Sequence, residues 1–210
     1  MKDPEGGDPG RGSPPVPLED PLSGTSPEAD PMASPPFPPG QITDVQAVIE
    51  SARARGGMET LERFIRRRLP EAEDSEVREA AEVAVEIIDS IPVFLARAHQ
   101  EAEERKLQSV VGPLLNHAEQ YFLQPMDLIP EMTQGLAGLL DDSYLFIRVL
   151  QHLDEGPERF LDWDLEYPAQ FLRTLVGVDI SRRLDAIVLD AMNQVQHHLT
   201  ELWTRMAHPA

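Results

Sequence analysis

Four carboxylates in the middle of the chain have the residue types and the spacing that could hold a divalent cation. Asp127 and Glu131 lie about one helical turn apart, and the adjacent pair Asp141 and Asp142 follows ten residues after Glu131. Hard cations such as Mg²⁺ and Ca²⁺ prefer oxygen ligands of this kind. A cation-binding site or a cation-dependent enzyme is therefore one hypothesis for this segment.

A structural role accounts for the same carboxylates without a metal. Asp127 and Asp141 each stand where a helix is expected to begin, and a side-chain oxygen there can accept hydrogen bonds from the first backbone N–H groups. Asp142 can cap the same helix or pair with Arg148, and Glu131 can face solvent. We favour this interpretation and predict no cofactor, with a divalent cation as the alternative.

Other residues that could do chemistry form no recognisable catalytic set. His117 lies one turn before Tyr121 and could face the carboxylates, although a single helical histidine more often has a surface or structural role. His197 and His198 are adjacent, so in a regular helix they point about 100° apart and cannot bind one ion together. The chain has no cysteine, and no Ser-His-Asp order or glycine-rich phosphate loop is present. We lean against an enzyme and leave the point open.

Prolines and glycines set the backbone around the carboxylates. Pro125 is expected to end the preceding helix, because the residue before proline is disfavoured in helical conformation. Asp127 followed by Pro130 suits a helix start, since proline in the first turn loses no hydrogen bond. Gly135 and Gly138 allow a turn or a close approach of two helices. The segment therefore specifies a backbone shape and does not specify a reaction.

The stretch from Tyr121 to Glu131, with Gly138-Leu-Leu-Asp-Asp142 and an apolar helix after it, resembles the YkvA-like domain of unknown function 1232. The resemblance covers about residues 118–150. Glu131 stands where the family has a second aspartate, and Thr133-Gln134 stand where Ile-Pro is usual. The motif positions carried by the resemblance are Tyr121, Pro125, Asp127, Pro130, Glu131, Gly138, Asp141 and Asp142.

The resemblance implies a compact helical unit of unassigned function. It supplies no reaction and no cofactor. Members of the family are often described as membrane-associated, so the resemblance also implies membrane association as an alternative, through an apolar helical hairpin around Asp127 to Leu150.

The first forty residues differ in composition from the rest of the chain. They hold twelve of the twenty prolines and six of the thirteen glycines, and their apolar residues are isolated. Such a segment cannot bury enough apolar area to offset the entropy of ordering. We therefore predict a disordered acidic tail at 1–40 and one helical domain at 41–210.

Apolar residues from position 41 onward recur at spacings of three and four, and no window alternates with a period of two. Thr43 and Ser75 are expected to cap helices, Gly56-Gly57 to end the first helix, and Pro92 to kink or interrupt the third, with 94–106 solvated beyond it. The predicted fold is all-α, an irregular bundle of six to eight helices. Helices are predicted at about 43–55, 58–69, 75–91, 107–122, 143–153, 167–175 and 181–206.

The charge of the chain bears on its partners. The tail has two basic and seven acidic residues, for −5, and residues 41–210 have sixteen and thirty, for −14, which together give −19. Such a surface repels phosphate backbones, so no nucleic acid is predicted. Arg63 and the run Arg66 to Arg68 could form a local basic face, but we expect them to end a helix and complement its dipole.

These observations favour a non-enzymatic, soluble helical protein that acts through protein contacts. The N-terminus lacks an apolar signal region, and no run of eighteen apolar residues occurs, so a cytoplasmic location is expected. The alternatives are membrane association and divalent-cation binding or catalysis at the acidic cluster. The oligomeric state and the partner's identity are not predicted.

Overall fold

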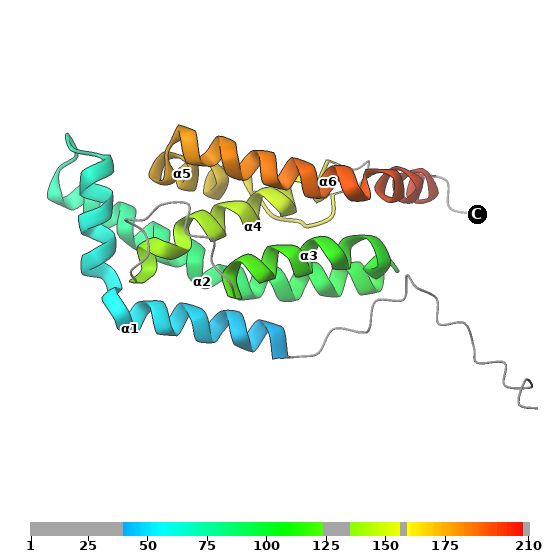
Figure 1. The fold of residues 1–210 in the computed structure, drawn as a ribbon, viewed down its shortest axis with the longest axis horizontal. Helices are drawn as coiled ribbons and strands as arrows, with labels where there is room; N and C mark the ends of the chain where they lie inside the picture. The colour runs from blue at the N-terminus through cyan, green and yellow to red at the C-terminus, as the bar shows by residue number, and fades with distance from the viewer. Residues whose placement is uncertain (1–39, 124–134, 156–158, 208–210) are drawn as a thin grey trace, which may run out of the picture. The chain divides into compact units, whose positions relative to one another are not determined.

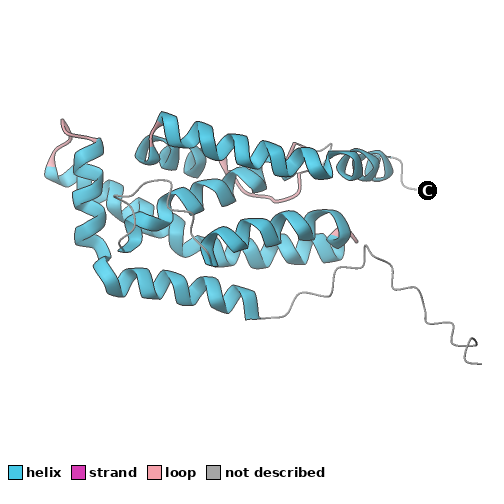
Figure 2. Cartoon of the chain, viewed as in Figure 1, coloured by secondary structure: helices cyan, strands magenta, loops and turns pink. Residues whose placement is uncertain are grey.

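All regular secondary structure in the described part of the chain is helical. The computed structural model describes residues 40–123, 135–155 and 159–207, with backbone alone for 40–41, 196–199, 201–203 and 205–207. These ranges hold six α-helices and one 3-10 helix and contain no strand, which confirms the predicted all-α bundle (Figure 2). By its internal contacts the chain divides after Ala33, and 34–210 form one unit.

Helix α4 lies at the centre of this unit. It contacts α2, α3, α5, α6 and η2, and nearly all of its side chains are buried (Figure 1). The apolar residues from Tyr144 to Leu150, interrupted by Arg148, explain this position, because apolar side chains on several faces of a helix must be covered on each of them. The helices are α1 (Gly40–Arg68), α2 (Asp74–Glu104), α3 (Gln108–Leu123), η2 (Gly135–Leu139), α4 (Leu140–Leu153), α5 (Glu166–Val176) and α6 (Val178–Ala207).

Helix α1 is two helical pieces joined at a break. Gly57 has φ 36° and ψ −151°, which confirms the break predicted at Gly56-Gly57. The 3-10 helix η2 packs against α1, and a Cβ added at Gly135 would lie 3.1 Å from the Cα of Gly56 and 3.1 Å from Oγ1 of Thr60. Gly135 itself has φ 68°. Glycine at 135 therefore permits both the backbone conformation and the close contact.

Three of the four helix starts predicted from side-chain caps are corrected by the structure, and the fourth, at Asp127, lies outside the described residues. Helix α1 begins at Gly40, so Thr43 lies inside it. The N-cap of α2 is Glu73 and not Ser75, and the Glu73 backbone N–H donates to the Glu76 carboxylate at 2.7 Å, as in a capping box. Asp141 is not the N-cap residue of α4 either: that position is Leu139, because η2 runs directly into α4 and leaves no extended residue between them.

Two prolines lie inside helices that they do not interrupt. Helix α2 continues through Pro92, so the third helix is not interrupted there, and α3 begins five residues before Pro113. The second half of α2 was expected to be solvated, but Leu95, Ala98 and Ala102 are buried. They are buried because α2 and α3 pack against each other as a helical hairpin.

Candidate functional site

A groove of about 500 Å³ lies between α3 and α6, two helices that run along each other in Figure 1. That volume is in the range of ordinary ligand and peptide pockets. Its lining residues recur about every four positions on each helix, so each helix offers one face. From α3 the lining residues are Pro113, Leu114, His117 and Tyr121, and from α6 they are Ala186, Ile187, Asp190, Ala191, Gln194 and Val195.

The groove has an apolar base and a polar edge. Ile187 and Val195 are half-buried and pack on the core, whereas His117, Asp190 and Gln194 are exposed. The Gln194 side-chain amide donates to Oδ2 of Asp190 at 3.2 Å. The His117 and Tyr121 rings meet edge to face with centroids 5.1 Å apart. A few polar groups beside apolar surface are typical of a binding site.

Tyr121 connects the groove to the motif carboxylates. Burial raises the pKa of its hydroxyl above the ordinary value of 10.0, and the negative charge of Asp142 raises it further. Asp142 lies in the first turn of α4 and is buried. The structure therefore brings Asp142 close enough to Tyr121, 21 positions away in the sequence, for its charge to act on the Tyr121 hydroxyl.

Half of the predicted motif lies outside the described residues. Those positions are Pro125, Asp127, Pro130 and Glu131. Of the rest, Gly138 is in η2, and Asp141 and Asp142 are buried in the first turn of α4, where negative charge is stabilised by the helix dipole.

The cation hypothesis remains a hypothesis. Within 40–123, 135–155 and 159–207, no three His, Asp or Glu side chains are placed to hold a metal ion together. Two of the four proposed ligands, Asp127 and Glu131, fall between those ranges.

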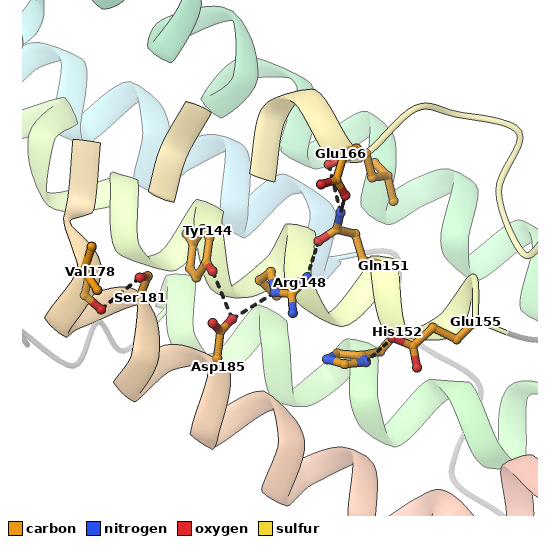
Figure 3. Close-up of polar contacts among 10 residues, drawn as sticks. Tyr144, Arg148, Gln151, His152, Glu155, Glu166, Val178, Ser181 and Asp185 are labelled. Atoms are coloured by element: carbon orange, nitrogen blue, oxygen red, sulfur yellow. Dashed lines mark hydrogen bonds and ion pairs between the residues drawn. The ribbon is translucent and has the colours of Figure 1, made fainter. Parts of the chain in front are cut away.

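A polar network holds α4 against α5 and α6 (Figure 3). Asp185 of α6 accepts hydrogen bonds from the Tyr144 hydroxyl and from Nε of Arg148, each at 2.9 Å. Arg148 also donates to Oε1 of Gln151 at 2.6 Å, and Gln151 donates to Glu166 of α5 at 3.0 Å. Burial and the bond to Asp185 raise the pKa of Tyr144 to about 12. The members bond to one another, so the network positions helices.

A second, polar cavity of about 310 Å³ borders this network. Arg148, Gln151 and Glu166 line it together with residues of the α4–α5 connection. Asp154 fixes part of that connection, because its Oδ1 accepts the backbone N–H groups of Phe160 and Leu161 at 2.8 and 2.9 Å. The side chains at this cavity are engaged in holding structure, so we do not take it as the binding site.

The sequence patterns did not reveal a buried pair between α2 and α3. Nε2 of His99 lies 2.7 Å from Oε1 of Glu119, which is 1% exposed. Oε2 of Glu119 has no hydrogen-bond partner among the described residues. His99 was expected in a solvated stretch. Its pairing with Glu119 becomes apparent only once α3 is known to pack against α2.

The arginines at the end of α1 occupy its last turn, as expected. Nη2 of Arg66 lies 2.6 Å from Oδ1 of Asp74, and Nη2 of Arg63 lies 2.8 Å from Oε1 of Glu59. The guanidinium carbon of Arg68 lies 5.3 Å from the centroid of the Phe64 ring. In the part of the chain that the structure describes, no helix is both long enough and apolar enough to span a bilayer.

No protein-family model, curated protein or solved structure matches the chain. The resemblance to the YkvA-like domain therefore stays an expectation drawn from residues 118–150.

Proposed function

We propose that this protein is a non-enzymatic helical interaction module and that the groove between α3 and α6 is its binding surface. The observation that supports the proposal is the groove itself, which combines apolar residues with His117, Asp190 and Gln194 at its edge. Helices present such faces to amphipathic partners, with apolar anchors in the groove and polar contacts along the side.

Contacts within the protein also preform the groove in the absence of a partner. Both α3 and α6 contact the buried α4, and Asp185 of α6 is tied to Tyr144 and Arg148 of α4. Phe122 of α3 meets Phe146 of α4 edge to face at 6.3 Å between ring centroids. A preformed surface loses less conformational entropy on binding, which favours affinity.

The proposal places the protein in the cytoplasm. Its acidic surface would be repelled by anionic lipid headgroups, which argues against stable docking on a membrane. Cell fractionation without detergent tests this part: recovery in the membrane pellet would contradict it and favour the membrane-associated alternative.

Site-specific photo-crosslinking tests the groove directly. A photo-reactive phenylalanine derivative replaces Gln194 at the groove in one full-length variant and Glu82 on the exposed face of α2 in the control. The proposal expects one defined protein adduct in cells from position 194 and none of that mass from position 82. Equal adducts from both positions, or none from 194, would reject the groove as the binding surface.

A further inference from the structure

We propose that the occupant of the groove is an amphipathic helix of another protein, with lysine or arginine beside its apolar face. This inference rests on the proposed function, because it names the partner class of the same groove. It is carried by the length of the groove and by the charge around it.

The dimensions of the groove fit a short helix. The α3 side runs from Pro113 to Tyr121 and the α6 side from Ala186 to Val195. At 1.5 Å per residue these stretches are about 12 and about 14 Å long. A partner helix covers this distance in two to three turns, so apolar residues at i, i+4 and i+7 would reach along the whole groove.

The charge at the groove is negative. Asp190 is exposed at its middle, and none of the residues that line it is lysine or arginine. Arg183 lies one helical turn before Ile187 and outside the lining set, so the cation of a partner is expected beside Asp190 and not at the start of α6.

The same charges disfavour the other available occupants. The 39 residues before α1 carry a net −5, and a second copy of the chain carries −19. Either one would bring further negative charge to a negative surface, and like charges in an interface oppose binding. A basic helix brings the opposite charge.

Fluorescence anisotropy with designed peptides tests the inference on the full-length protein. The probe is a labelled helical peptide of about 16 residues, long enough for measurable helicity, with leucines at i, i+4 and i+7 and lysines beside them. Two matched peptides carry glutamine or glutamate in place of lysine. The lysine peptide should bind at least about ten-fold more tightly than the glutamate peptide, and its binding should weaken as salt is raised.

Variants of the protein locate the binding. Ile187→Lys should abolish binding of the lysine peptide, whereas Leu189→Lys, which also introduces a lysine but at a 53% exposed position of α6 outside the groove, should leave it intact. Asp190→Asn should weaken the lysine peptide about two- to five-fold and leave the glutamine peptide unchanged. Glu82→Gln on α2 controls for the loss of one negative charge. Thermal melts confirm that each variant is folded.

The remaining results separate this inference from the proposed function. Equal binding of the three peptides, or binding that survives Ile187→Lys, overturns the inference that the partner is a basic helix. Absence of peptide binding also overturns this inference. The proposal that the groove is the binding surface is still supported if position 194 gives its defined adduct. In the purified protein, a crosslink from position 194 to residues 1–39 or to a second copy identifies one of those as the occupant and overturns the inference. Failure of both the peptides and the cellular adduct rejects the function as well.

Discussion

At the scale of single residues, the buried and half-buried polar groups described above mainly fix helices in place. Asp185 receives bonds from Tyr144 and Arg148, and Glu119 is paired with His99. A buried polar group without its partner costs about 1–3 kcal/mol, so such pairs give the helix contacts a defined register.

Tyr144 gives stability a measurable pH dependence. Its folded-state pKa of about 12 is above the ordinary 10.0, so the folded state binds the proton more tightly than the unfolded state. This contribution is complete below pH 10 and is lost as the pH rises from 10 through 12. We expect urea unfolding to show a smaller loss of stability over this range in Tyr144→Phe than in the parent protein.

Tyr167→Phe is the control for that experiment, because Tyr167 is 61% exposed. It should keep the pH dependence of the parent. An unchanged slope in Tyr144→Phe would show that the hydroxyl is not held as described.

His99→Ala should lower the free energy of unfolding by about 1–3 kcal/mol, because it leaves the Glu119 carboxylate buried without this partner. His152→Ala is matched, since the His152 side chain is 17% exposed and that of His99 is 18%, but its partner Glu155 is 64% exposed. His152→Ala should lower the free energy of unfolding by less than His99→Ala, because water can hydrate the exposed Glu155 carboxylate. Urea denaturation measures both, and equal losses would refute a special role for the buried pair.

At the scale of elements, periodicity predicted where helices lie, and tertiary contacts decided where they begin and what they bury. Apolar spacing identified α4, α5 and α6 to within a few residues. It did not predict that α2 continues through Pro92, since helix packing can compensate for one lost hydrogen bond. Nor did it predict the turn after α2, where Lys106 adopts φ 58° and the N–H of Leu107 bonds to the Ala102 carbonyl at 2.7 Å.

The candidate site was predicted less completely than the helices. His117 and Tyr121 were noted from their spacing, but the groove also needs the face of α6 that carries Ile187 and Asp190. Nothing in a pattern of period 3.6 states which helix lies opposite which. That information comes from packing around α4.

Gly135→Ala should destabilise the fold more than Gly57→Ala. Both glycines have positive φ, and such sparsely populated backbone conformations cost other residues about 1–3 kcal/mol. A Cβ at Gly135 would also press on Gly56 and Thr60, whereas a Cβ at Gly57 meets nothing within 4 Å. Urea denaturation measures the free energy of unfolding of both variants: Gly57→Ala reports backbone strain alone, and Gly135→Ala reports strain together with the contact. A Gly135→Ala cost equal to or below that of Gly57→Ala would show that the contact of η2 with α1 is not tight.

At the scale of the whole molecule, one charge sign dominates. The net charge is −14 for residues 41–210 and −5 for the tail, so the chain should favour basic partners and disfavour phosphate backbones. The net charge could be predicted fully from the sequence, because it depends on composition and not on the fold.

Removal of residues 1–39 should leave the melting temperature unchanged. The prediction follows from their composition, which offers only isolated apolar side chains for packing. Differential scanning calorimetry of the full chain and of 40–210 measures it. A fall of several degrees in the shorter chain would mean that the tail packs on the helices.

The central claim is that the α3–α6 groove is where this protein binds its partner. The most direct measurement is the yield of the defined adduct from position 194 in cells that carry Ile187→Lys or Leu189→Lys. The account predicts that Ile187→Lys eliminates the adduct and that Leu189→Lys keeps it at the parental level. An adduct of the same mass and yield in both variants would contradict the claim.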